Sequence, residues 1–204
     1  MAITYPLSTP ADIGLAQINL RAANATAVAE SPFTYAQQVH AHAGQRWEAS
    51  VSVTPALRQY SEPWVAFLLS LKGRVGTFYL GDPAGATPRG AAKDNSDTLT
   101  IGTQTAVGDT QLVISGATTA TGYFLPGDYI QVGSQLFKVL ASADSSASSV
   151  TVDVWPDVRS VQSVGTSVVS TNAKGLFRLA SGVSEWSISN ANTYGIAFEA
   201  IEVI

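Results

Sequence analysis

The sequence contains no cysteine, and His40 and His42 are its only histidines. The absence of cysteine excludes disulfide bonds, zinc–thiolate sites and thiol nucleophiles. Two imidazoles leave few candidates for acid–base catalysis or for a metal site. Chemistry that depends on these side chains therefore has little support in the chain.

Charge is also scarce. Charged residues make up 13% of the sequence and hydrophobic residues 46%, whereas about 25% charged residues is usual for a soluble globular domain. A surface so poor in charge favours a protein that neighbouring subunits partly cover. The formal net charge is −4 and no basic patch is visible, so the electrostatic footprint of a nucleic-acid-binding protein is missing.

Long apolar runs are missing as well. The longest, residues 64–69, is far shorter than the roughly 20 residues that cross a bilayer. Residues 1–6 have neither the basic nor the apolar region of a signal peptide. We therefore expect no membrane insertion, and folding in a cytoplasm.

What the sequence does contain is a series of short β-type segments separated by turns. Trp47, Ala49, Val51 and Val53 alternate with polar residues, which is the period of a strand with one buried face. Together with the abundance of small residues and turns, this pattern predicts a mainly β fold. Further strands are expected at 14–22, 33–42, 77–80, 98–101, 111–114, 129–132, 135–140, 150–154, 167–170, 175–179, 185–188 and 194–204.

One α-helix is expected near residues 61–73. Its apolar residues lie at the i, i+3, i+4 and i+7 positions of a single face; they are Trp64, Phe67, Leu68 and Leu71. Ser61 is a candidate N-cap, Pro63 is tolerated in a first turn, and Gly73 suits the left-handed residue that ends a helix.

The order of the segments predicts an insertion. Residues 84–96 form a turn-rich connector, either a hinge or an extended arm that lies on another subunit. Residues 97–172 contain only strand signals, with a tight turn at Gly133 and Ser134, and predict a small β-barrel or sandwich domain. The apolar C-terminal strand is expected to pair with the first segment. We therefore predict one domain from 1–96 and 173–204, made of strands and one helix, with residues 97–172 inserted as a second domain.

The search for catalytic or metal-binding motifs favours structural explanations. His40 and His42 share a face of a strand and could form a metal pair, but no acidic partner is placed beside them, so two polar residues on a half-exposed strand is the preferred interpretation. Asp94 and Asp97 could bind calcium, but the twelve-residue ligand loop is absent, and a polar turn is preferred. The sequence contains neither a phosphate-binding loop nor a nucleophile elbow. We predict no catalytic residue, no metal and no cofactor.

Two further pairs have competing interpretations. Glu199 and Glu202 resemble a general acid and base, but their spacing places them on opposite faces of a strand, so subunit contacts or solvated positions are preferred. Trp47, Trp64 and Trp186 fall on apolar stripes and are expected in the core. Trp155 either belongs to the core or is an exposed residue that binds a partner.

Three stretches of sequence carry a resemblance to a known family. They are residues 31–34 with 37–39 and 47–49, residues 64–78 with 80–83, and residues 127–133 with 174–180. In these stretches the chain resembles the distal tail proteins, a minor tail protein family of long-tailed, siphovirus-like bacteriophages. The resemblance spans nearly the whole chain, but it consists of framework residues and includes no reaction signature.

The resemblance implies a virion protein of the tail tip, assembled in the bacterial host cytoplasm. Such proteins have a tail-tube-like domain, a β-sandwich with a flanking α-helix, often with a second small β-barrel that residues 97–172 would form here. They assemble into a homo-oligomeric ring, usually a hexamer. The ring would join the tail-tube protein on one side to the tail-tip hub protein on the other. The tape-measure protein and DNA would pass through its lumen without specific binding.

Two surfaces are candidates for contacts under this hypothesis. Polar residues within β segments are expected to face the lumen or a neighbouring subunit: Gln17, Asn19, Arg21, Gln37, Gln38 and His40. In an alternative hypothesis the inserted barrel binds a host carbohydrate or protein through an exposed aromatic platform of Tyr123, Phe124 and Trp155. A third hypothesis, an enzyme such as a wall hydrolase, has as candidates His40 with Asp12 or Glu48.

Overall fold

The computed structural model describes residues 3–11, 13–94 and 96–204. The chain is mainly β, as predicted, and its strands form two antiparallel sheets accompanied by one α-helix. The first sheet contains β1 (Leu15–Glu30), β2 (Gln37–Val53), β3 (Ala56–Leu57), β4 (Phe78–Leu80), β13 (Gly175–Leu179), β14 (Trp186–Ile188) and β15 (Thr193–Glu202). The second sheet contains β5 (Thr100–Ile101), β6 (Gln111–Ser115), β7 (Ala120–Phe124), β8 (Tyr129–Val132), β9 (Gln135–Val139), β10 (Ala143–Ser146), β11 (Ser149–Trp155) and β12 (Val168–Val169).

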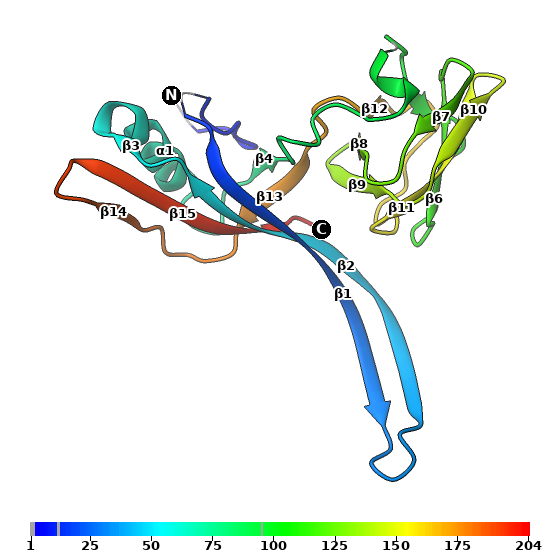
Figure 1. Ribbon diagram of the computed structural model, residues 1–204, viewed down its shortest axis with the longest axis horizontal. Coiled ribbons are helices and arrows are strands. Elements are labelled where there is room, and N and C mark those ends of the chain that lie inside the picture. Colours follow the sequence, from blue (N-terminus) through cyan, green and yellow to red (C-terminus); the bar gives the residue numbers. More distant parts are fainter. Residues whose placement is uncertain (1–2, 12, 95) are drawn as a thin grey trace.

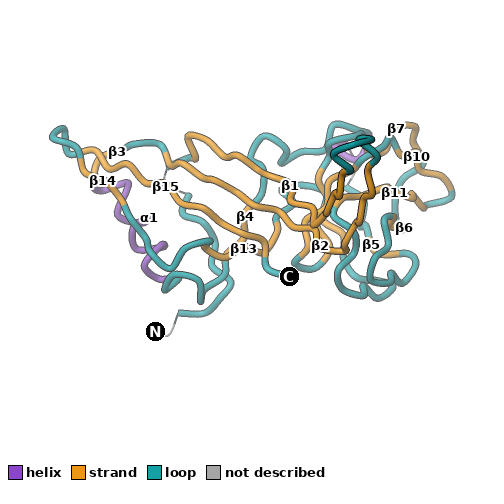
Figure 2. The backbone as a smooth tube through the Cα atoms, turned by 90° about the horizontal axis from the view of Figure 1, so that it is seen from below, coloured by secondary structure: helices purple, strands orange, loops and turns teal. Residues whose placement is uncertain are grey.

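The first sheet brings together the two ends of the sequence. Its strand order is β1-β2-β15-β13-β4, with β3 and β14 also paired to β15. The C-terminal strand β15 lies against β2 in the register Phe198 to Val51, so the expected pairing of the C-terminus with the first segment is confirmed. In Figure 1 the second sheet lies to one side of this arrangement, and Figure 2 shows the same elongated layout from below.

Strands β1 and β2 form one long hairpin, which corrects the predicted strand at residues 33–42. Residues 31–36 are its loop: the Ser31 amide donates to the Ala36 carbonyl at 2.9 Å, and Tyr35 has φ of 55°. A strand would require an extended backbone at Tyr35. Residues 37–42 belong instead to the same strand as the alternating segment that begins at Trp47.

Helix α1 (Arg58–Ser70) begins earlier than predicted. Ser61 is not its N-cap: the side chain lies inside the helix, and its Oγ donates to the Ala56 carbonyl at 3.1 Å. Pro63 also lies inside the helix, where the missing N–H would have bonded to a carbonyl of the first turn. The helix ends at Ser70 with Leu71 as its C-cap, which is earlier than the predicted stop at Gly73. Lys72 is the first left-handed residue after it, with φ of 50°, and Gly73 follows with φ of +65°.

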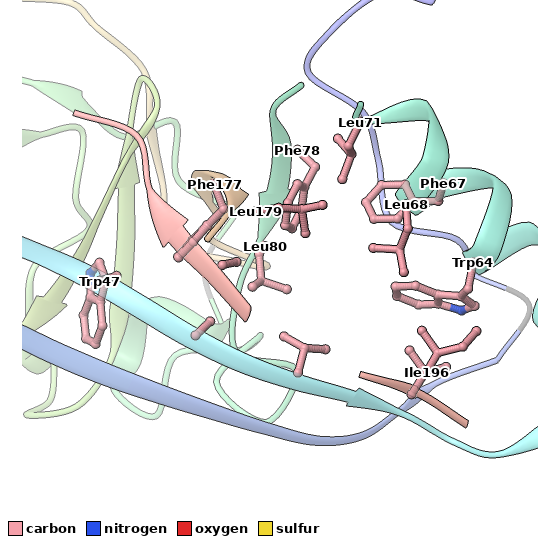
Figure 3. Packing of buried hydrophobic residues seen from close by; sticks show 14 of the residues in the cluster. Trp47, Trp64, Phe67, Leu68, Leu71, Phe78, Leu80, Phe177, Leu179 and Ile196 are labelled. Atoms are coloured by element: carbon pink, nitrogen blue, oxygen red, sulfur yellow. The ribbon is translucent and has the colours of Figure 1, made fainter. Parts of the chain in front are cut away.

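The core of the first sheet lies between α1 and the strands. Phe67 packs edge-on against Phe78 of β4, and Trp64 lies beside Ile196 of β15 (Figure 3). The predicted alternation of β2 is confirmed, with Trp47, Ala49, Val51 and Val53 all at most 3% exposed. Trp186 differs from its expected place in the core: it lies on the edge strand β14, where the sheet covers only one of its flanks, and it is 38% exposed.

The second sheet is nearly closed on itself. Backbone hydrogen bonds from Ile101 to Thr166 and from Val168 to Leu99, at 2.8 and 2.9 Å, join its first strand to the segment around its last. The tight turn at Gly133 and Ser134 is confirmed between β8 and β9, with Gly133 at φ +59°. Strands β7 and β10 were not predicted: β10 has the sequence Ala-Asp-Ser-Ser and contains no strong strand former, and in β7 Gly122 interrupts the strand formers Thr121, Tyr123 and Phe124.

The connector at residues 84–96 is fastened to the second sheet over the part that the structure describes. It contains a short 3-10 helix, η1 (Ala91–Asp94). The backbone N–H of Arg89 donates to Asp128 Oδ1 at 2.9 Å, and Asn172 donates to the Ala86 carbonyl at 2.5 Å. These contacts favour a fixed connection over a free hinge.

Candidate intersubunit surface

The most unusual feature of the molecule is the outer half of the β1–β2 hairpin, which we call the arm and define as residues 25–43. Strand β15 pairs with β2 only over residues 48–52. Among the described residues, the arm therefore has no strand partner beyond its own two halves. Figure 1 shows it projecting away from both sheets.

The arm begins at an irregularity in the hairpin. Asn24 lies opposite Gln45, whereas Thr26 lies opposite Ala41. One residue of β1 therefore faces three residues of β2 between these pairs, which is a β-bulge. Gly44 is required here, since a Cβ on it would lie 2.9 Å from the Ala25 Cβ.

The arm exposes apolar side chains on one face and at its tip. Val28 lies opposite Val39, and these side chains are 59% and 61% exposed. At the tip, Phe33 is 92% and Tyr35 75% exposed. A two-stranded ribbon is at best marginally stable alone in water, and exposed apolar residues grouped on one element are typical of a contact surface.

All six polar residues predicted to make lumen or subunit contacts are exposed on this hairpin. Gln17, Asn19 and Arg21 lie on β1 opposite Ser52, Ser50 and Glu48, on the face turned away from the core. In the arm, Gln38 and His40 lie opposite Ala29 and Ala27, and so share a face. Gln37 lies on the other face, where its Nε2 donates to Glu30 at 2.5 Å. Their contact with a neighbour stays a prediction.

The first sheet also has two open edges. The outer side of β1 pairs with no other strand in the described part of the chain, and the same holds for the outer side of β14. Unpaired strand edges are templates for pairing with another chain, and proteins usually cover or interrupt them. The long edge of β1 is neither covered nor broken by proline over Leu15–Glu30.

The proposed aromatic platform on the inserted barrel is wrong for Tyr123 and Phe124. Both are 0% exposed, because β7 directs them into the core of the second sheet. Trp155 is half-buried and packs edge-on against Trp47, with ring centroids 4.6 Å apart. Its Nε1 donates to Asn24 Oδ1 at 2.9 Å, so it lies at the junction of the two sheets.

The candidates for catalysis are not brought together. His40 is exposed in the arm, and Glu48 lies eight positions along the same strand, roughly 25 Å away at the usual strand rise. Glu48 is paired with Arg46 at 2.7 Å and with Arg21 at 3.7 Å. Asp12 lies outside the described residues. No group of three potential metal ligands occurs in the part of the chain that the structure describes.

Glu199 and Glu202 occupy opposite faces, as their spacing predicted. Glu199 is exposed and lines an open depression of about 460 Å³ beside β15. Glu202 is buried and forms an ion pair with Arg159, with Nη2 and Oε1 2.5 Å apart. Its Oε2 accepts from the Trp47 backbone N–H at 2.9 Å. Glu202 is therefore a buried structural charge, which corrects its preferred interpretation as a subunit contact or solvated position. The sequence could not show this because Arg159 lies 43 positions away, in the loop that follows β11.

Asp97 is likewise part of a structural network. Its carboxylate accepts hydrogen bonds from the Thr118 N–H at 2.7 Å, the Thr118 hydroxyl at 2.8 Å and the Tyr123 hydroxyl at 2.7 Å. These bonds, the Thr118 backbone bond first, lower the pKa of Asp97. Burial raises the pKa of Tyr123, and the neighbouring Asp97 adds to this. Asp94 lies in η1, and the bonds of Asp97 reach residues 21 and 26 positions away, so Asp97 belongs to a tertiary network and not to the local polar turn that the sequence favoured.

This network predicts a pH-dependent contribution to stability. Because folding lowers the pKa of Asp97, its contribution is present above the unfolded value of about 3.9 and is lost as pH falls through the folded value. We expect Asp97→Asn to lower the free energy of unfolding by about 1–2 kcal/mol at pH 7 and by less at pH 3. Urea unfolding at both pH values measures this. An equal loss at both values would contradict it.

Comparison with known proteins finds no family model and no curated sequence that matches this chain. Within the described residues, no helix is long and apolar enough to cross a membrane. The functional argument therefore depends on the exposed hairpin and the open edges of the first sheet.

Proposed function

We propose that this protein is a non-enzymatic structural subunit of a phage tail tip, which forms a ring between the end of the tail tube and the tail-tip hub. The observation that carries the proposal is the first sheet, with its open edges at β1 and β14 and its unsupported arm. The sequence resemblance to distal tail proteins supplies the biological setting. The low charge content supports extensive contact between copies.

The geometry suggests how copies would associate. Strands β1 and β14 lie on opposite flanks of the ribbon β1-β2-β15-β14. Pairing the β1 edge of one copy with the β14 edge of the next is a heterologous contact, and such contacts close into a ring when the rotation between copies permits. The pairing would cover both edges and continue the sheet from copy to copy.

The faces of the sheet fit the two environments of such a ring. One face packs against α1 and is apolar. The opposite face carries polar side chains such as Gln17, Asn19 and Ser50, together with the Arg21–Glu48 pair. In a ring the polar face would line the lumen, where paired charges give passing DNA little to bind.

The structure does not support the surface on which the host-binding alternative depended. It required an aromatic platform on the barrel, and two of the three aromatic residues are buried. The third, Trp155, is held between the sheets. No other observation favours that function over assembly.

The mass of the purified protein in solution tests the proposal. Light scattering over a concentration series is expected to show a discrete species close to six times the subunit mass of 21.3 kDa. Electron microscopy of that species should show closed rings with a central opening. A monomer at every concentration would contradict self-association through the first sheet.

A further inference from the structure

The direction of the arm is not determined by the sheet from which it extends. β15 leaves β2 before the arm begins, and the β-bulge between Asn24 and Thr26 interrupts the regular pairing at its root. A bulge bends the strand that carries it and increases its twist. Without further support, a two-stranded ribbon beyond such a point would sample many orientations.

Support at the root comes from residues 155–159, which comprise the last residue of β11 and the start of the loop after it. Trp155 Nε1 donates to Asn24 Oδ1 at 2.9 Å. The backbone N–H of Asp157 donates to Gln45 Oε1 at 2.6 Å, and Arg159 Nη1 donates to the Gln45 carbonyl at 3.0 Å. Asn24 and Gln45 are the last regular pair before the bulge. Both strands of the hairpin are therefore held at the position where the arm begins.

This segment, residues 155–159, is itself held firmly. Gln135, which is buried on β9, donates to the Asp157 carbonyl at 2.8 Å and accepts from the Arg159 N–H at 3.2 Å. The Arg159 guanidinium is paired with Glu202 of β15. The segment is thus bonded to the second sheet, the first sheet and the root of the arm.

We propose that residues 155–159 are a positioning clamp that sets the direction of the arm, so that the second sheet and the arm move as one body. The clamp is a property of the single chain and applies to a monomer as well as to a ring. If the arm also makes contacts between copies, as in the proposed function, a partner that displaces the second sheet would change those contacts.

The distance between the arm and the second sheet tests the clamp. Because the chain has no cysteine, two spin labels can be attached at introduced cysteines without removing native ones. Ala29→Cys labels the arm and Thr151→Cys labels β11, and both positions are exposed. A second pair, Gln59→Cys on α1 with Thr151→Cys, reports the placement of the two sheets. Labelled protein is diluted with unlabelled protein, so that only distances within one chain are measured.

In the unperturbed protein both labelled pairs are expected to give narrow distance distributions in pulsed electron–electron double resonance. Adding Asn24→Ala with Gln45→Ala removes the two root bonds that use hairpin side chains. The Arg159 bond to the Gln45 carbonyl and the Arg159–Glu202 pair stay in place. We expect the 29–151 distribution to broaden and shift, while the 59–151 distribution stays unchanged.

Gln38→Ala is the matched control, because Gln38 is an exposed arm glutamine that lies away from the clamp. It should leave both distributions unchanged. An unchanged 29–151 distribution in the double variant would overturn the proposal. So would an unperturbed protein whose 29–151 distribution is already much broader than its 59–151 distribution. Should the double variant fail to fold, Asn24→Ala alone gives the same comparison.

Discussion

Glu202→Ala is expected to lower the free energy of unfolding by about 3–5 kcal/mol, the usual cost of leaving one partner of a buried ion pair uncompensated. The Glu202 side chain is 0% exposed and that of Arg159 is 13% exposed. The substitution would leave the largely buried Arg159 guanidinium without its carboxylate partner. It would also remove the acceptor of the Trp47 backbone N–H. Chemical denaturation at pH 7, followed by tryptophan fluorescence, measures the loss.

Two comparisons make this prediction specific. Glu62→Ala breaks the exposed pair with Arg58, whose side chains are 44% and 77% exposed, and should cost at most about 0.5 kcal/mol. Replacing both buried partners, as Arg159→Met with Glu202→Leu, should recover most of the loss, because it removes both charges together. If Glu202→Ala cost no more than Glu62→Ala, the buried pair would not be what joins the two sheets.

Val28→Lys with Val39→Lys is expected to abolish the ring and leave the fold unchanged. The two side chains lie opposite each other on one face of the arm and are more than half exposed in the single chain. Lysine at both positions therefore costs the isolated subunit little, although two like charges opposite each other repel. At a contact between copies, the same charges would be buried without partners. Light scattering should show a shift from the ring to the monomer, with an unchanged melting temperature for the monomer.

Val107→Lys is the control for this experiment. Val107 is 68% exposed and lies in the loop between β5 and β6 of the second sheet, outside the arm and the strands of the first sheet. It should leave the ring intact. If the arm variant assembled as well as the control, the arm would not be a contact surface, and the open edges of β1 and β14 alone would have to explain association.

Local patterns in the sequence determined much of the secondary structure. The alternation from Trp47 to Val53, the apolar face of α1 and the turn at Gly133 depend on neighbouring residues and on backbone preferences, so they can be recognised without tertiary contacts. The start of α1 was placed too late because Ser61 resembles an N-cap. In the folded chain, the extended pairing of β3 with β15 sets the start of the helix, at Leu57.

The exposure of the polar hairpin residues also followed from the sequence, since Gln17 and Asn19 alternate with the apolar Ile18 and Leu20 and Gln38 lies in a polar part of its β segment. The burial of Tyr123 and Phe124 in the inserted barrel did not follow from the sequence, which had placed them on its surface. Tyr123 lies between Gly122 and Phe124, where apolar and polar residues do not alternate, so no local period showed whether its side chain would be covered. Burial depends on which distant strands stack over a residue, and for Tyr123 these include β10 and the segment that contains Asp97.

By itself, then, the sequence determined that this is a cysteine-free, charge-poor, mainly β protein with one helix and with polar β segments that lie exposed. Only the tertiary structure decided that residues 15–53 form a single hairpin, and that Trp155 and Arg159 hold its root. It also decided that Glu202 is a buried structural charge. These features depend on contacts between residues up to 155 positions apart, such as Trp47 and Glu202, and no local period or motif encodes such a contact.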